Sequence, residues 1–392
     1  MPDTQDGRDP SGESRVSINN ARPGYDPAKS RDGVTTRVLS AYSVGHFAND
    51  LCASMWFIYL SYYLLYVADL PENIASLALL SGQIADGITT PIVGTMSDRI
   101  SCSCGAKNAW YYFGSLLVIP CFLCIFLNFD LDDETMKNAW YISFPAIFNV
   151  GWASVQIAHM SIVNSLAYSQ RKRDTMVNNR NAFTYGANIL MLTTSLILFL
   201  FISNSTLQFR VLSLFCVGVG VITSLFYVGT VIEPPLTKKA TEGEENYQLG
   251  LGKKPKPKVQ VTDTDGKVKI QGKRARDWLS EAQFYIFGVV YMSARIALNA
   301  TATMMPLYLR TVCLFTPRPG METSAQIASV PLVSYIFSLI FSLTLQARIT
   351  QKFANRLVPM AMAFVVTTIA SVPLGFLDGS DIRYLVYPCA AL

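Results

Sequence analysis

Apolar runs of roughly 20 residues alternate with short polar segments along most of this chain, and this pattern limits what it can fold into. A helix needs about that many residues to cross about 30 Å of hydrocarbon. Only 15% of the residues are charged and 51% are apolar, a composition unlike that of an ordinary soluble domain. We therefore predict an all-α integral membrane protein with several membrane spans.

The polar segments divide the chain into nine predicted spans and the start of a tenth. Residues 1–37 form a polar tail that is predicted to be disordered, and residues 233–282 form a flexible linker between two bundles. Six spans in 38–232 precede this linker, and 283–392 holds spans seven to nine and the start of the tenth. We expect two six-helix halves related by an axis along the membrane normal, with the second half truncated in this sequence. The predicted spans are 40–67, 73–97, 109–129, 138–166, 181–203, 211–232, 283–309, 325–347 and 353–377.

The Lys and Arg residues are distributed unequally between the two sides of the predicted spans. Twenty-six of them, Arg180 included, fall in the tail and the loops of one side, and five fall on the other. Cytosolic loops carry such an excess, so the N-terminus and the linker are predicted to be cytosolic. The basic stretch Lys253–Lys258 is explained by this topology and by attraction to lipid, and no nucleic-acid partner is predicted.

Four titratable side chains on four different spans are predicted to lie about 15 to 18 Å from the cytosolic ends of those spans, close to the membrane midplane. They are Asp50, Asp86, His159 and Arg295. Each charged group at a helix centre costs on the order of 2.5 to 3.5 kcal/mol. Because the four share a depth, we expect them to face one polar cavity in the bundle.

Asp50, Arg295, His46 and Trp152 are the predicted substrate-binding residues. His46 precedes Asp50 by four positions, which places both side chains on one face of a helix. A zwitterionic substrate would place its ammonium at Asp50 and its carboxylate at Arg295. A sugar would use several hydrogen-bonding groups and an aromatic platform such as Trp152, and the residues alone leave both substrates open.

Asp86 and His159 are the predicted residues for cation or proton coupling. At the cytosolic end of span two, Gly94, Asp98 and Arg99 are predicted to form a gate whose ion pair exists in only one conformation. The purely structural alternatives are hydrogen-bonding roles for His159 and His46 and an ion network without transport. No catalytic residue, metal ligand or cofactor motif is predicted, and the protein is not expected to be an enzyme.

The stretch that begins at Asp86 and ends with Ser97-Asp98-Arg99 resembles the span-two signature of the major facilitator superfamily. The version found here is that of glycoside-pentoside-hexuronide:cation symporters, whose first helix is similar to residues 42–66. The resemblance implies the major facilitator fold, a substrate contact for Asp50 and a place for Asp86 in the cation site. Thr90 stands where bacterial members usually have a second acid, which favours a proton over sodium as the coupling cation.

Residues 44–57, 82–94, 151–161 and 291–309 are most similar to an animal branch of this superfamily, which imports cysteine into lysosomes and melanosomes. The resemblance implies a small-molecule solute, a coupling cation and the lipid bilayer as partners, in a lysosomal or melanosomal membrane. The alternatives are a sugar:cation symporter and a transport-inactive membrane scaffold or receptor.

Overall fold

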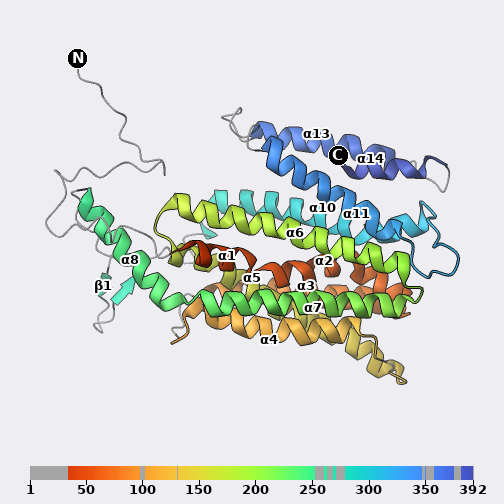
Figure 1. Cartoon of the computed structure of the whole chain (residues 1–392), viewed down its shortest axis with the longest axis horizontal. Helices are drawn as coiled ribbons and strands as arrows, with labels where there is room; N and C mark the ends of the chain where they lie inside the picture. Colours follow the sequence, from red (N-terminus) through yellow and green to blue (C-terminus); the bar gives the residue numbers. More distant parts are fainter. Residues whose placement is uncertain are drawn as a thin grey trace, which may run out of the picture.

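Long helices that run roughly parallel to one another form the body of the molecule (Figure 1). The computed structural model describes residues 34–97, 102–129, 131–251, 260–262, 268–270, 279–346, 349, 357–374 and 381–391. Within these ranges six helical stretches are long and apolar enough to cross a membrane. They are α4 (Ala106–Phe126), α5 (Glu134–Leu166), α6 (Gln170–Phe201), α7 (Ser205–Thr230), α10 (Ala282–Thr311) and Gln326–Leu345, which joins α11 (Gln326–Phe341) to the π-helix η2 (Ser342–Gln346). The predicted all-α membrane architecture is confirmed.

Two further helices of similar length, α2 (Phe47–Tyr66) and α3 (Glu72–Met96), lie in the same bundle. Neither contains an uninterrupted apolar stretch like those of the six above, because they carry the polar residues of spans one and two, including Asp50 and Asp86. Most of α2 is nevertheless buried, and it packs against α6, α7 and α10. Its polar side chains are therefore turned towards protein and away from lipid, as expected for polar groups in a span.

The first predicted span is not one continuous helix. Helix α1 (Thr36–Val44) ends at Gly45, and α2 begins after His46. A Cβ atom at Gly45 would lie 2.8 Å from Cγ of Tyr227 and 3.0 Å from Nε2 of His159, closer than packed atoms allow. The glycine thus lets α7 and α5 approach the backbone at the break. The Tyr111 hydroxyl donates to the Gly45 carbonyl at 2.6 Å, so the oxygen stays satisfied inside the protein.

Helix α6 begins earlier than predicted, at Gln170 and not near residue 181. Ser169 caps it by accepting a hydrogen bond from the Lys172 amide at 3.2 Å. The first turns of α6 are polar, and their low hydropathy places them outside the predicted span 181–203. Arg180, which was counted among the cytosolic charges, therefore lies within the helix.

In the first half of the chain, α5 packs along both α3 and α4. Gly114 of α4 and Gly151 of α5 permit the closest part of this contact, because a Cβ on Gly151 would lie 2.9 Å from the Gly114 carbonyl oxygen. Small residues at such crossings are the usual basis of close packing between membrane helices. This packing fixes the face that α5 presents to α1 and α2.

The linker begins as helix α8 (Glu233–Gly250), which projects from one end of the bundle (Figure 1). This part of the linker, predicted to be flexible, is therefore helical. The short antiparallel strands β1 (Gln260–Thr262) and β2 (Val268–Ile270) follow it. Glu233 accepts hydrogen bonds from the amides of Lys107 and Asn108 at 2.9 Å each, and so ties the start of α8 to the N-terminus of α4.

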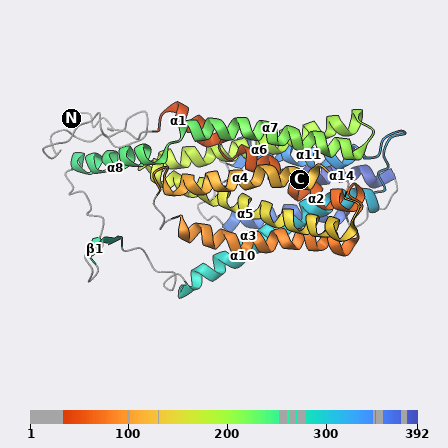
Figure 2. The ribbon, with the colours of Figure 1, turned by 90° about the horizontal axis from the view of Figure 1, so that it is seen from below.

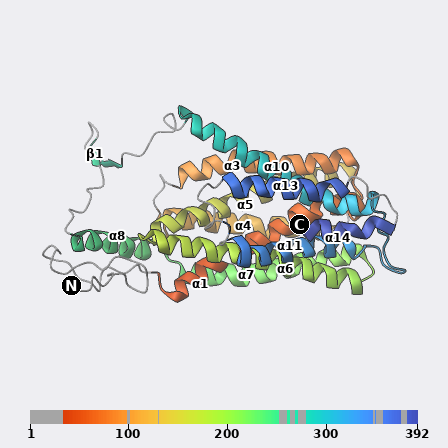
Figure 3. The same ribbon diagram turned by 90° about the horizontal axis from the view of Figure 1, so that it is seen from above.

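The elements after the linker are α10, α11, η2, α13 (Leu357–Leu374), the 3-10 helix η3 (Asp381–Leu385) and α14 (Val386–Ala391). Helix α10 contacts α2, and α11 contacts α6. At the end of the molecule nearest α8, α10 diverges from the other helices (Figures 2 and 3). The helices before the linker and the helices after it are therefore closer together at the end away from α8. We refer to these two sets of helices as the two parts of the chain.

Replacing Gly45 with Val is expected to lower the apparent melting temperature of the detergent-solubilised protein. The new side chain would overpack the break against Tyr227 and His159, a change that typically costs about 1 to 3 kcal/mol. Gly218→Val in α7 is the matched control, since an added Cβ there meets nothing within 4 Å. Equal melting temperatures for the two variants would contradict the close packing at the break.

Candidate functional site

A buried histidine and aspartate pair lies directly after the break between α1 and α2. His46 Nδ1 is 2.8 Å from Asp50 Oδ1, and the two residues are 2% and 7% exposed. Asp50 sits in the first turn of α2, where the positive end of the helix dipole favours a carboxylate. The structure thus brings together two of the predicted substrate-binding residues in the four-residue spacing that the sequence showed.

Helix α6 supplies the other side of this site from three positions spaced four residues apart. The Thr184 hydroxyl donates to Asp50 Oδ2 at 3.0 Å, and Arg180 Nη2 lies 3.4 Å from His46 Nδ1. One turn further on, Asn188 accepts a hydrogen bond from the Ser54 hydroxyl. Because residues four apart share a helix face, one stripe of α6 covers the polar face of α2. We refer to His46, Asp50, Arg180 and Thr184 as the polar cluster.

Among the residues that the structure describes, the hydrogen-bonding pattern leaves the Arg180 guanidinium without an acceptor. A carboxylate oxygen can only accept, so His46 Nδ1 carries the proton that is donated to Asp50. That nitrogen then has no free lone pair for Arg180. The buried Nε of Arg180 has no hydrogen-bond partner either, and no carboxylate forms an ion pair with Arg180 among the residues that the structure describes. An arginine in this state presents a donor fork suited to a carboxylate or phosphate.

His159 lies beside the polar cluster and is fully buried. Its Nε2 donates to the Tyr42 carbonyl at 2.9 Å, and its ring stacks on the Tyr42 ring with centroids 4.4 Å apart. The His46 ring is 5.4 Å away, and Nδ1 of His159 has no partner. The contacts of His159 thus stabilise the break in the first span and place an unused ring nitrogen near His46.

Asp86 belongs to a second polar group on α3. It is partly buried and accepts a hydrogen bond from the Thr90 hydroxyl at 3.1 Å. Arg295 of α10 is close enough to act on it electrostatically. No hydrogen bond or ion pair joins Asp86 or Arg295 to Asp50 in the part of the chain that the structure describes. Of the four groups expected in one cavity, His159 lies beside His46 and Asp50, and no described hydrogen bond or ion pair joins Asp86 and Arg295 to them or to each other.

The remaining predicted residues occupy separate places. Trp152 is 8% exposed, packs edge-on against Phe57 and has a buried indole N–H without a partner. Gly94 is partly exposed, and an added Cβ there would meet nothing within 4 Å, so no described residue approaches it closely. Asp98 and Arg99 lie outside the described residues, and the gate remains a prediction.

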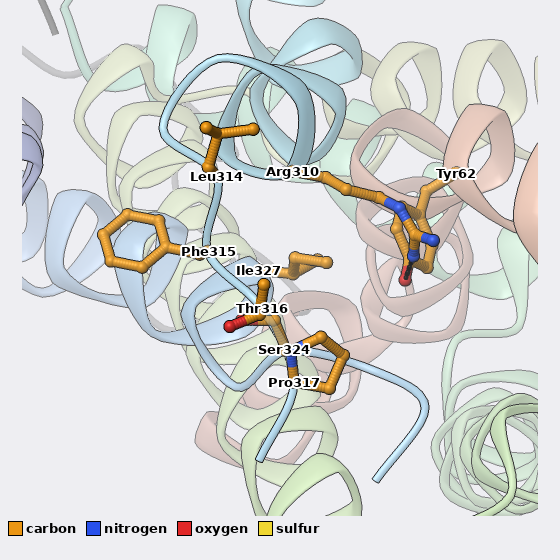
Figure 4. Close-up of a pocket in the computed structure, with 8 residues that line it drawn as sticks. All are labelled: Tyr62, Arg310, Leu314, Phe315, Thr316, Pro317, Ser324 and Ile327. Atoms are coloured by element: carbon orange, nitrogen blue, oxygen red, sulfur yellow. Dashed lines mark hydrogen bonds between the residues drawn. The ribbon is translucent and has the colours of Figure 1, made fainter. Parts of the chain in front are cut away.

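At the end of the bundle away from α8, an arginine of α10 binds two tyrosines of α2. Arg310 Nη1 donates to the Tyr62 hydroxyl at 3.0 Å, and the guanidinium carbon lies 4.0 Å from the centre of the Tyr66 ring. Such cation–π contacts contribute about 0.5 to 2 kcal/mol. Figure 4 shows Arg310 extending towards Tyr62 at the edge of a pocket that Phe315 and Ile327 also line. None of the predicted substrate-binding residues lines this pocket.

A second contact links the two parts of the chain at the same end. Glu322, in the loop between α10 and α11, accepts hydrogen bonds from the Ser205 amide at 2.8 Å and the Ser205 hydroxyl at 2.6 Å. Its own amide donates to the Ser203 carbonyl at 3.1 Å. These bonds hold the pKa of the Glu322 carboxyl below its usual value. We call the Arg310 and Glu322 contacts together the outer clasp.

Comparison with known proteins shows the family and the fold of the chain. Residues 41–374 match the family described as MFS/sugar transport protein. The chain belongs to this family. Mouse major facilitator superfamily domain-containing protein 12 is 33% identical over 354 residues, a match covering 84% of this chain and 69% of the mouse protein. The human counterpart is 33% identical over 328 residues, 77% of this chain and 64% of that protein.

The matches span about two thirds of the length of these relatives. Among solved structures, the inward open form of the xylose transporter XylE from E. coli superposes with a TM-score of 0.50. The superposition covers 90% of this chain and 77% of XylE at 12% sequence identity. At that identity the likeness shows the fold alone, and it confirms the predicted major facilitator fold.

Arg180, Thr184 and Asn188 are not among the predicted site residues, because Arg180 falls just before the predicted span 181–203 and the other two are uncharged. The spacing of four between the three residues was a usable signal, since it marks one polar stripe on a helix that becomes apolar further on. Arg310 was read only as a charge on the non-cytosolic side. Its contact with Tyr62 and Tyr66 joins segments far apart in sequence, and nothing local in the chain indicates it.

The N-terminus of α7 is expected to lose protection as Glu322 is protonated. Because the pKa of Glu322 is lowered in the clasp, the clasp gains stability that is complete above the ordinary value of 4.5 and is lost as the pH falls through the lowered value. Hydrogen exchange of the Ser205 amide, corrected for its intrinsic pH dependence, measures this loss.

Glu322→Gln is the matched comparison for that experiment. Its Ser205 amide should exchange faster than that of the unaltered protein near neutral pH, and the difference should vanish in acid. A difference that persists unchanged in acid would show that Glu322 protonation does not control this contact.

Proposed function

We propose that this chain is the transporting part of a secondary active carrier that moves a small polar solute by alternating access. The observation that carries the proposal is the polar cluster: a buried carboxylate and histidine face an arginine that has no acceptor within the described ranges. Unpaired charge in a span costs several kcal/mol and is retained mainly where it has a function. Tyr335 of α11 packs against the buried core that contains much of α2, which supports a site between the two parts of the chain.

An amino acid suits this cluster better than an uncharged solute. Asp50 has the charge to bind an ammonium, and Arg180 has the planar fork to bind a carboxylate. In this proposal Arg180 binds the substrate carboxylate in place of Arg295, since Arg180 lies beside His46. Cysteine, in a lysosomal or melanosomal membrane, is the substrate we propose from the family resemblance, and it satisfies both charge requirements.

Asp86 is the proposed coupling group, with a proton as the coupling ion. Its one described hydrogen-bond partner is the Thr90 hydroxyl, and no second carboxylate is paired with it among the described residues. Sodium sites gather several oxygen ligands, whereas a lone, partly buried carboxylate can carry a proton. Arg295 lies near enough to respond to the charge on Asp86. A change of charge on α3 would thereby act on α10, a helix of the other part of the chain. His159 is the proposed second carrier of the proton through its Nδ1, which has no hydrogen-bond partner among the described residues.

The outer clasp gives the conformational change a physical basis. It holds α2 to α10 and the α10–α11 loop to α7 at one end, while α10 diverges at the other end (Figures 2 and 3). This arrangement corresponds to a carrier closed on the non-cytosolic side. Opening that side requires the Arg310 and Glu322 contacts to break while new contacts form near α8.

A sugar is the second candidate substrate, and the unpartnered indole N–H of buried Trp152 favours it. Such a donor could bind a hydroxyl group, and the family description includes sugar transport. Uptake of labelled cysteine and of labelled sugars by proteoliposomes, with and without a pH gradient, separates the two substrates. Uptake of neither, in a protein that remains folded, would support the scaffold alternative.

Thr184→Val is expected to raise the KM for the transported solute about tenfold with little change in kcat. The variant removes a hydrogen bond to a charged group, which contributes about 1.5 to 3 kcal/mol. Thr194→Val on the same helix is the control, because the Thr194 hydroxyl donates only to the Leu190 carbonyl. Equal KM values for the two variants would show that the polar cluster is not part of the substrate site.

Asp86→Asn is expected to abolish uptake driven by a pH gradient while exchange of solute across the membrane continues. The amide keeps the shape and the Thr90 contact but cannot exchange a proton with water. Measuring both gradient-driven uptake and counterflow in the same vesicles distinguishes lost coupling from lost binding. Normal gradient-driven uptake in this variant would assign coupling to another group.

A further inference from the structure

Two cysteines lie together in a tight turn just before α4. The Gly105 amide donates to the Cys102 carbonyl at 3.0 Å, which closes a turn over Cys102-Ser103-Cys104. The turn places the two Sγ atoms 2.9 Å apart. Cys102 is exposed and Cys104 is partly exposed, and both are free thiols. They lie outside the membrane-spanning helices, on the side that the Lys and Arg distribution predicts to be cytosolic.

The two thiols differ in chemical character. Hydrogen bonding from the Cys104 thiol lowers the pKa of Cys102, and the same contact raises the pKa of Cys104. Cys102 is thus the better thiolate at neutral pH and has the greater exposure to reagents. This is the asymmetry of a nucleophilic cysteine with a second cysteine positioned to resolve it.

We propose that Cys102 and Cys104 form a reversible redox site that is oxidised to an intramolecular disulfide by low-molecular-weight disulfides. The Cys102 thiolate attacks one sulfur of the reagent, forming a mixed disulfide and releasing one thiol. The Cys104 thiolate then attacks Cys102 Sγ, and the second reagent thiol leaves. Each cycle oxidises two protein thiols, reduces one reagent disulfide to two thiols and is reversed by excess thiol.

The turn lies where its oxidation would affect the contact between α4 and α8. Gly105 follows the pair directly, has a positive φ of 101° and lies against Glu233, whose Cβ would be 2.6 Å from an added Cβ. Glu233 in turn caps α4 and begins α8. A disulfide across the turn would constrain the backbone at this junction.

The sequence contains a second closely spaced pair that serves as an internal control. Cys121 and Cys124 lie inside α4, where Cys121 is buried and the helix holds the two residues on successive turns. Burial raises the pKa of most thiols and slows their reaction. That pair is expected to stay reduced under conditions that oxidise Cys102 and Cys104.

The test uses the purified full chain in lipid nanodiscs, incubated with oxidised glutathione, alkylated with N-ethylmaleimide and digested for mass spectrometry. The peptide holding Cys102 and Cys104 is expected to lose both alkylation sites together and to be lighter by two hydrogens. Dithiothreitol should restore both sites. Alkylation of both thiols after the incubation, at the rate seen without it, would overturn the proposal.

Single substitutions separate the two steps. Cys104→Ser should trap glutathione on Cys102, because no second thiol resolves the mixed disulfide. Cys102→Ser should react several-fold more slowly, since Cys104 is the poorer nucleophile. Neither cysteine is buried, so both variants are expected to keep the melting temperature of the unaltered protein. A stable glutathione adduct on the unaltered protein, equal to that of Cys104→Ser, would show that Cys104 does not resolve it.

Discussion

The break between α1 and α2 is the feature on which the proposed site depends. Inside a membrane, a helix can be interrupted only where other groups satisfy the freed backbone. Here His159 donates to the Tyr42 carbonyl and Tyr111 donates to the Gly45 carbonyl, so α5 and α4 supply what the helix gives up. The interruption places His46 and Asp50 at the start of α2, where the positive end of the helix dipole stabilises the Asp50 carboxylate.

The polar cluster is assembled from two helices, α2 and α6, that differ in burial and in where their polar residues lie. Helix α2 is largely buried and carries a carboxylate that is hydrogen-bonded on both oxygens. Helix α6 is polar at its start and apolar later, so its first turns can hold Arg180 and Thr184 against α2. Because the histidine already satisfies one carboxylate oxygen, Arg180 is left with donors to offer. Both oxygens of the Asp50 carboxylate are thus hydrogen-bonded, whereas the Arg180 guanidinium has no acceptor among the described residues.

Contacts at the two ends of the molecule differ in kind. The outer clasp consists of exposed or partly exposed polar contacts between the two parts of the chain, each worth little enough to break during a conformational change. At the other end, Glu233 joins α4 to α8, and α10 diverges from the other helices. The cysteine turn lies at that same junction, where a covalent change would act on backbone geometry and leave the polar cluster chemically unaltered.

The amino-acid sequence by itself determined the all-helical membrane architecture, whereas the common depth of the charged residues stays a prediction. Apolar length is a local property, so the spans could be counted from composition, and the four-residue spacing placed His46 beside Asp50. The sequence could not show that span one breaks at Gly45, that Arg180 belongs to a helix, or that Asp86 and Asp50 fall into separate groups. Those features depend on how each helix is rotated against its neighbours. Only tertiary packing decided them, because rotation is set by side chains that meet across helices and are far apart in the chain.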